Sequence, residues 1–231
     1  MRQASRYLVS TLFLLVLPVD WHGGWAASSL SNRQVEELVR HIEARYAQLQ
    51  DLQAVFNQET RIEGFETPLT STGRVYMKKP AFLRWDYLEP SEEYIYVHGD
   101  QVEMYTPAHE QILRGSLTSM VSSKAPLQLL QGASRLTDHF EIHPAQDSRG
   151  ESGLPRLVLI PRDREHSPVV RIVSEVDPKT YLLKTVTLYE KNGNRSTFRF
   201  SQIQTNRGLD DRLFRLIPPE GVVIIEDAIP H

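Results

Sequence analysis

The 231-residue chain contains no cysteine and carries a formal net charge of only -3. Without cysteine the chain has no disulfide and no thiol nucleophile, so even in an oxidising compartment its stability must come from packing. The charge lacks the strong basic excess of a nucleic-acid-binding surface, and we expect no nucleic-acid partner. The sequence also has no HExxH motif, no GxSxG motif and no Gly-rich phosphate loop, which argues against the common hydrolases and against a nucleotide site.

Long apolar runs are equally scarce. The longest, residues 8–17, is shorter than the roughly 20 residues that span a bilayer. Arg2 and Arg6 precede it, and the small-x-small sequence Gly24-Trp25-Ala26 follows it. This order is typical of a secretory signal peptide, so we expect residues 1–26 to be removed and residues 27–231 to form one domain in the periplasm. The alternatives are an uncleaved anchor and a buried N-terminal helix.

The clearest helix is predicted over residues 31–50. Ser31 is a good N-cap, and Gln34 three residues later completes a capping-box pattern. Apolar residues recur there at steps of three and four, which indicates a single apolar face that lies on another layer. These residues are Val35, Leu38, Val39, Ile42, Tyr46 and Leu49.

After residue 52 the sequence turns into about eleven short runs rich in aromatic and β-branched residues. Most connections are too short for crossover helices, which favours an antiparallel meander, and Asn192-Gly193 is the strongest two-residue hairpin signal. The predicted strands are 55–61, 73–79, 82–88, 94–98, 102–106, 111–114, 140–143, 156–160, 169–176, 182–190 and 196–204.

Residues 116–132 interrupt this β pattern. Leu117, Met120 and Val121 have helical spacing, and Pro126 and Gly132 suit the start and end of a second short helix. Residues 145–154 are polar and are expected to form an exposed loop. The fold class is therefore mainly β (α+β): an incomplete antiparallel β-barrel of about 11 strands with an α-helical lid. Its interior is either filled by side chains or encloses a cavity.

Residues with catalytic or metal-binding chemistry form no recognisable pattern. The eight histidines are scattered, and only His139 and His143 have a metal-like spacing. The segment between them is predicted as a strand and no third ligand is evident, so surface histidines are favoured over a metal site. The acid pairs Glu92-Glu93 and Asp210-Asp211 are typical of solvated turns. We therefore expect no catalytic residue, no metal and no cofactor, and a chain that is not an enzyme.

Strand alternation indicates an apolar interior with a cation near its mouth. Val75, Met77 and Lys79 share one face of their strand, and Leu83 and Trp85 share one face of the next, together with Tyr87. If these faces point inward, Lys79 lies at the strand end beside the opening. By pattern alone an ordinary solvated lysine is the favoured interpretation of Lys79, and Trp85 and Tyr87 are more often core residues than ligand-binding ones.

Over residues 31–226 the sequence resembles the LolA family of outer-membrane lipoprotein carriers. The segments that carry the resemblance occur in the family's order. They are Phe56-Asn57-Gln58, residues 73–80, Arg84-Trp85-Asp86-Tyr87 with Pro90, His98-Gly99-Asp100, Met104-Tyr105-Thr106-Pro107, residues 125–130, Leu159-Ile160-Pro161, Asn192-Gly193-Asn194 and residues 214–222.

The resemblance implies an open β-barrel that shields the acyl chains of lipoproteins in a hydrophobic cavity. It also implies the partners: triacylated, outer-membrane-directed lipoproteins as cargo, an inner-membrane lipoprotein-releasing ABC transporter as donor, and a LolB-like outer-membrane receptor. We expect the carrier to be a monomer. The predicted cavity residues are Phe56, Val75, Met77, Leu83, Trp85, Tyr87, Leu127, Leu129 and Leu130.

Lid closure is where the sequence departs from the family. The family has an arginine that hydrogen-bonds to the lid and holds it shut, and Lys79 stands at the matching position. Lysine offers a point charge without the planar fork of arginine, so closure is expected to be weaker or to be shared with Arg84. The family's aromatic residue two positions before the tryptophan is replaced by Leu83.

Three other functions fit parts of the sequence. A lipid-sensing regulator of the RseB type needs a second domain, for which little chain remains after residue 226. A carrier or sensor of other lipids or glycolipids would use the same fold. A periplasmic lipid hydrolase would need a nucleophile motif that the sequence lacks.

Overall fold

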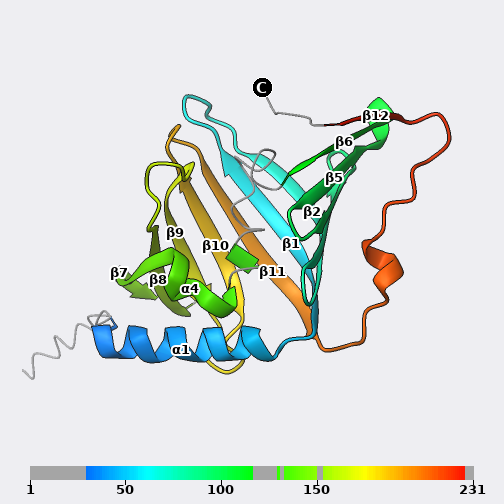
Figure 1. The fold of residues 1–231 in the computed structure, drawn as a ribbon. Helices are drawn as coiled ribbons and strands as arrows, with labels where there is room; N and C mark the ends of the chain where they lie inside the picture. Colours follow the sequence, from blue (N-terminus) through cyan, green and yellow to red (C-terminus); the bar gives the residue numbers. More distant parts are fainter. Residues whose placement is uncertain (1–29, 117–128, 131–132, 150–152, 227–231) are drawn as a thin grey trace, which may run out of the picture.

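The computed structural model describes residues 30–116, 129–130, 133–149 and 153–226. Within them the chain forms one 12-stranded sheet with the order β12-β6-β5-β4-β3-β2-β1-β11-β10-β9-β8-β7. The two outermost strands, β12 and β7, do not pair, so the sheet curves without closing (Figure 1). This confirms the predicted incomplete barrel.

The predicted strands are all present, and a twelfth follows them. The strands are β1 (Asp51–Arg61), β2 (Leu69–Lys78), β3 (Phe82–Glu89), β4 (Glu93–His98), β5 (Gln101–Thr106), β6 (Gln111–Ser116), β7 (Phe140–Arg149), β8 (Pro155–Pro161), β9 (Val169–Val176), β10 (Leu183–Glu190), β11 (Arg195–Thr205) and β12 (Val223–Ile225).

Two meanders, β1–β6 and β7–β11, join through one long-range pairing. β1 pairs antiparallel with β11, so that Phe56 lies opposite Phe200 although 144 residues separate them along the chain. The hairpin between β10 and β11 turns at Gly193, whose φ of 86° suits glycine, as the Asn192-Gly193 signal predicted.

The main helix, α1 (Asn32–Gln48), begins as the sequence predicted. The Ser31 side chain accepts a hydrogen bond from the Gln34 amide, and the Gln34 side chain accepts one from the Ser31 amide, at 3.3 and 2.9 Å. The helix lies across the ends of β9–β11 (Figure 1) and buries one face, made of Val35, Val39, Ile42 and Tyr46. The hydroxyl of Tyr46 accepts a hydrogen bond from the backbone amide of Leu183 at 3.2 Å.

Several helical or strand elements were not predicted or differ from prediction. The 3-10 turn η2 (Ala133–Arg135) and the helix α4 (Leu136–His139) follow the expected helical pair, most of which lies outside the described residues. β7 runs on to Arg149, so the prediction that residues 145–154 form a loop was wrong for its first half. β12 pairs in parallel with β6, against the expected antiparallel pattern. The sequence did not predict this strand, because its three exposed apolar residues show no alternation.

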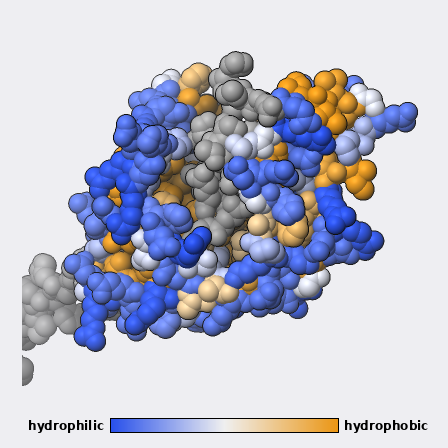
Figure 2. Space-filling view, viewed as in Figure 1, coloured by the Kyte–Doolittle hydropathy of each residue, from blue (hydrophilic) through white to orange (hydrophobic). Residues whose placement is uncertain are grey.

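A C-terminal segment, residues 206–226, runs back over the outside of the sheet. It contains the 3-10 helix η3 (Asp211–Phe214) and the strand β12. The helix η3 lies against β3 and β4. Figure 2 shows apolar side chains gathered over β12, whereas the face along α1 is mostly hydrophilic. Of the helices in the described part of the chain, none combines the length and apolarity needed to span a bilayer.

Candidate functional site: the apolar interior and its mouth

The concave face of the sheet is lined by one cluster of aromatic rings. The ring of Trp85 lies 4.5 Å from that of Phe56, 5.6 Å from that of Phe198 and 6.2 Å from that of Phe200, measured between centroids. Tyr87 meets Phe56 edge-on at 5.3 Å. Trp85 is 1% exposed and Phe56 is fully buried. The interior is therefore aromatic, apolar and closed to solvent.

A glycine makes room for this cluster. A Cβ built on Gly73 would lie 2.6 Å from the Phe56 ring and 1.9 Å from the carbonyl oxygen of Asp86. Gly73 lies opposite Phe56 in β1 and opposite Tyr87 in β3, so the Phe56 ring occupies the space above its backbone. Here glycine is needed for close approach, since its φ is not in the positive range.

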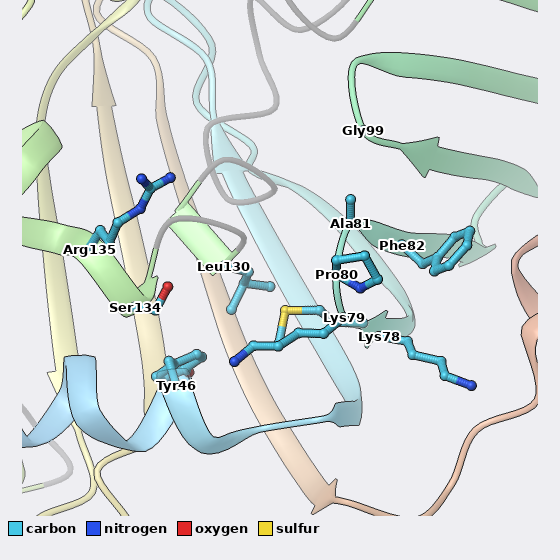
Figure 3. Close-up of a pocket in the computed structure, with 11 residues that line it drawn as sticks. Tyr46, Lys78, Lys79, Pro80, Ala81, Phe82, Gly99, Leu130, Ser134 and Arg135 are labelled. Atoms are coloured by element: carbon cyan, nitrogen blue, oxygen red, sulfur yellow. The ribbon is translucent and has the colours of Figure 1, made fainter.

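At one end of the interior lies a cavity of about 280 Å³, which we call the mouth (Figure 3). Tyr46 of α1, Met77 of β2 and Leu130 line the mouth, together with Lys79, Pro80 and Ala81 of the turn between β2 and β3. Ser134 and Arg135 of η2 complete the wall. Met77 pairs with Leu83, and the next inward pair is Val75 with Trp85, so the mouth leads along these two strands to the aromatic cluster.

Lys79 lies at the mouth, as alternation predicted, and contacts helix α1. Its Nζ donates a hydrogen bond to the carbonyl oxygen of Ala47, and its backbone amide donates one to the carbonyl oxygen of Gln50 at 2.9 Å. The last carbonyl groups of a helix have no partner within the helix and carry partial negative charge. A lysine can therefore fasten the end of α1 to the β2–β3 turn without the forked geometry of arginine.

We call residues 129–130, η2 and α4 together the cover of the interior. Hydrogen bonds join the cover to α1. Leu129 and Leu130 are 1% and 4% exposed and belong to the core cluster, as does Leu136 of α4. Beside them, the amide and hydroxyl of Thr137 both donate to Glu43 Oε1 of α1, at 2.8 and 2.9 Å. Leu127, also predicted to line the cavity, lies outside the described residues.

Arg84 does not lie on this side of the sheet. Its Nε donates to Asp86 at 2.8 Å, and its Nη1 donates to the carbonyl oxygen of Leu213 in the C-terminal segment at 3.1 Å. The guanidinium also lies 5.1 Å from the centre of the Tyr96 ring. Residue 84 alternates with Leu83 and Trp85, so its side chain points to the convex face, and the expected share of Arg84 in lid closure is wrong.

Burial changes the acidity of two tyrosines in the interior. Desolvation raises the pKa of Tyr46 to about 12, against the opposing effect of its hydrogen bond with the Leu183 amide and the charge of Arg45. Desolvation and then the charge of Glu93 raise the pKa of Tyr87, which the Trp85 indole partly offsets. Both hydroxyls therefore stay protonated at neutral pH and act as neutral polar groups in an apolar wall.

Sequence analysis missed several residues of the site. Phe198 and Phe200 alternate inward on β11, and this signal was visible in the run 196–204. What was not visible is that β11 pairs with β1, which brings both rings to Trp85. Ser134 and Arg135 lie in a turn with no periodicity. Among the described residues, no group of three His, Cys, Asp or Glu side chains is arranged to hold a metal ion.

The fold and the site together define a class: a half-closed antiparallel sheet whose concave apolar face is covered by helices. Residues 47–217 match the family model described as "Outer membrane lipoprotein carrier protein LolA". The chain belongs to the LolA family, which confirms the resemblance seen in the sequence.

Relatives in several bacteria agree with this assignment. An outer-membrane lipoprotein carrier protein of Methylococcus capsulatus is 31% identical over 176 residues, which cover 76% of this chain and 81% of the relative. One from Pseudomonas aeruginosa is 23% identical over 221 residues, covering 95% and 99%. An uncharacterised conserved protein of Thermus thermophilus has the same fold, with a TM-score of 0.55, 12% identity, and coverage of 83% of this chain and 98% of that one.

Proposed function

We propose that the protein shields the acyl chains of lipoproteins in its apolar interior and carries them across the periplasm from the inner to the outer membrane. The donor would be an inner-membrane lipoprotein-releasing ABC transporter and the acceptor a LolB-like outer-membrane receptor. Removal of residues 1–26 as a signal peptide would place the chain in that compartment, with residues 27–231 as its single domain.

The observation that carries the proposal is the contrast between the interior and the bonds that hold its cover. The interior is built from aromatic and aliphatic side chains: Phe56, Val75, Met77, Leu83, Trp85, Tyr87, Leu129 and Leu130. Among the described residues, directional bonds lie at the edge of this interior: Thr137 of α4 bonds to Glu43 of α1, and Lys79 of the β2–β3 turn bonds to Ala47 of α1. Apolar contacts have no direction, so an acyl chain can replace those that the cover makes.

The free energy of acyl-chain burial fits a carrier that is loaded by a separate transporter. Shielding a methylene is worth about 0.8 kcal/mol, so one acyl chain of ordinary length represents on the order of 12 kcal/mol. Opening the cover exposes Leu129, Leu130 and Leu136 and costs part of that gain. Closed and open forms that differ by a few kcal/mol would let the cargo itself determine which form is populated.

The direct test is capture and transfer of a lipoprotein. Protein purified from periplasm should carry acylated adducts in native mass spectra, and it should release a lipoprotein from inner-membrane vesicles into the soluble fraction. Persistent absence of adducts together with no uptake would contradict the proposal. Extraction of free lipids or glycolipids instead of lipoproteins would favour the alternative cargo on the same fold.

A substitution in the cover sharpens the test. Leu129→Glu places a charge in the apolar interior, and we expect at least tenfold less capture. The matched control is Leu69→Glu, because Leu69 is 58% exposed and should tolerate the same change. Circular dichroism must show that both variants fold. Equal capture by the two variants would remove the cover from the site.

A further inference from the structure

One buried hydrogen-bond donor in the interior has no partner. The indole Nε1 of Trp85 is inaccessible to solvent and forms no hydrogen bond of acceptable geometry with any described residue. It lies close enough to the Tyr87 hydroxyl to oppose the rise in the pKa of that group, but the two do not form a proper hydrogen bond. A buried N–H without an acceptor costs about 1–3 kcal/mol, so its presence in an apolar wall needs a reason.

The position of this donor relative to the mouth suggests its acceptor. Trp85 pairs with Val75, one inward pair beyond Met77 and Leu83, and Met77 lines the mouth. Two residues of a strand span about 7 Å, so the backbone of Trp85 lies about 7 Å farther along β3 than that of Leu83, which pairs with Met77 at the mouth. An acyl chain that enters there tail first brings its carbonyl group in last. That carbonyl is the only hydrogen-bond acceptor of the chain, and it would stop near this depth.

Apart from the Tyr87 hydroxyl, the residues around the donor leave it little choice of ligand. The rings of Phe56, Phe198 and Phe200 enclose the indole and offer no acceptor. Gln58, on the same face of β1, also has a buried atom without a partner, but that atom is the acceptor Oε1. Of these two groups only Trp85 can bind a carbonyl oxygen, and a pure hydrocarbon tail would leave it unpaired.

We propose that Trp85 Nε1 donates a hydrogen bond to the ester carbonyl oxygen of a bound acyl chain, so that the interior recognises acyl esters and not merely hydrocarbon. The proposal rests on the proposed function, because it concerns the same interior. It adds the chemical group that is read and the depth at which the chain stops. The Trp85 N–H would have a hydrogen-bond acceptor only when an ester-linked chain is bound.

The experiment compares two probes that differ only in this group. The first is a synthetic cysteine lipopeptide whose glyceryl group carries two palmitoyl esters, and the second is the matching dialkyl ether. The full chain is used with Trp21→Phe and Trp25→Phe, which leaves Trp85 as its single tryptophan. We expect the ester to bind about fivefold more tightly, which is the effect of one hydrogen bond. The ¹H–¹⁵N resonance of the indole should move downfield with the ester and not with the ether.

Two variants complete the test. Trp85→Phe should bind both probes equally, since it removes the donor and keeps a ring. Phe198→Leu, the control, should weaken both probes alike and keep the preference for the ester. Equal binding of the two probes by the unsubstituted Trp85 chain, with an unmoved indole resonance, would overturn the inference and leave the carrier function standing. Binding of neither probe would overturn both.

Discussion

The two faces of strand β3 are covered in different ways. On the convex face, Arg84 and Asp86 form an ion pair, and Arg84 also holds the backbone of the C-terminal segment at Leu213. On the concave face, Leu83 and Trp85 belong to the buried apolar cluster that also contains Leu129 and Leu130. Directional, charge-assisted bonds favour a single arrangement, whereas apolar contacts can be exchanged for others of similar area. The two faces of β3 are therefore covered by contacts of different kinds, directional charged bonds on the convex face and apolar contacts on the concave face.

Breaking the convex covering should have the largest effect on stability and little effect on binding. Arg84→Met leaves the carboxylate of Asp86, which is 4% exposed, without its main partner. Burial already raises the pKa of Asp86, and Arg84 opposes that rise. We expect a loss of about 3 kcal/mol in the free energy of unfolding, measured by urea denaturation at neutral pH.

The control for this prediction removes both charges. Arg84→Met combined with Asp86→Leu should recover most of the lost stability, because no uncompensated charge remains. Capture of the ester-linked probe should change by less than about twofold in both variants. A large loss of capture in the stable double variant would show that the two faces are not independent.

Crowding the concave face should have a smaller effect on stability and a larger one on binding. The added methyl group of Gly73→Ala meets the Phe56 ring and the Asp86 carbonyl. Overpacking of this kind costs about 1–3 kcal/mol, which thermal unfolding would measure. Because the Phe56 ring must move into the interior, capture of the acyl probe should fall severalfold.

A second substitution separates the two clashes of Gly73→Ala. Adding Phe56→Leu removes the ring contact and leaves the backbone contact with Asp86. We therefore expect partial recovery of stability and capture. No recovery at all would place the cost in the backbone between β2 and β3, and Gly73 would then have no bearing on the interior.

The features of this fold that the sequence predicts are those set by residues close together in the chain. Period-two alternation placed Val75, Met77, Leu83 and Trp85 on one face, and the capping box placed the start of α1. Both follow from residues close together in the chain. Strand alternation also put Lys79 on the side of the mouth, which the structure bears out through its bond to Ala47.

The errors fall where distant segments meet. Alternation along β3 puts Arg84 on the face opposite Trp85, whereas the family resemblance had suggested Arg84 as a second cation for lid closure. Arg84 bonds to Asp86 in the same strand and to the Leu213 carbonyl, which lies 129 residues away and has no side-chain signature. β12 was missed for a similar reason, because a three-residue strand is defined by its pairing with β6 and not by its own composition.

The start of the convex covering offers the smallest and most specific test. Asp51, at the beginning of β1, accepts hydrogen bonds from the backbone amides of Arg207 and Gly208 at 2.7 and 2.8 Å, and from that of Leu209 at 3.3 Å. Burial raises the pKa of the Asp51 carboxyl, but the three donors and the charge of Lys78 outweigh burial and hold that pKa below its ordinary value of 3.8. The ionised carboxylate therefore stabilises the turn from which the C-terminal segment departs.

The sign of the pH dependence follows from that lowered pKa. A carboxyl whose pKa is lower in the folded chain contributes stability above the unfolded value, near 3.8, and loses it as the pH falls through the folded pKa. Asp51→Asn should cost about 1 kcal/mol at neutral pH, because the amide keeps one acceptor oxygen. Denaturation of both proteins between pH 6 and pH 2.5 should show this difference shrinking below pH 3.8.

The quantity to follow is the difference in unfolding free energy between the two proteins at each pH. The pKa of Asp210 is also lowered, to about 2, but Asp210 titrates alike in both proteins and its effect cancels in that difference. A constant difference across that range would mean that the charge of Asp51 does not hold the turn. The C-terminal segment would then be held on the convex face by other bonds, such as those of Lys78 to Leu209 and of Arg84 to Leu213.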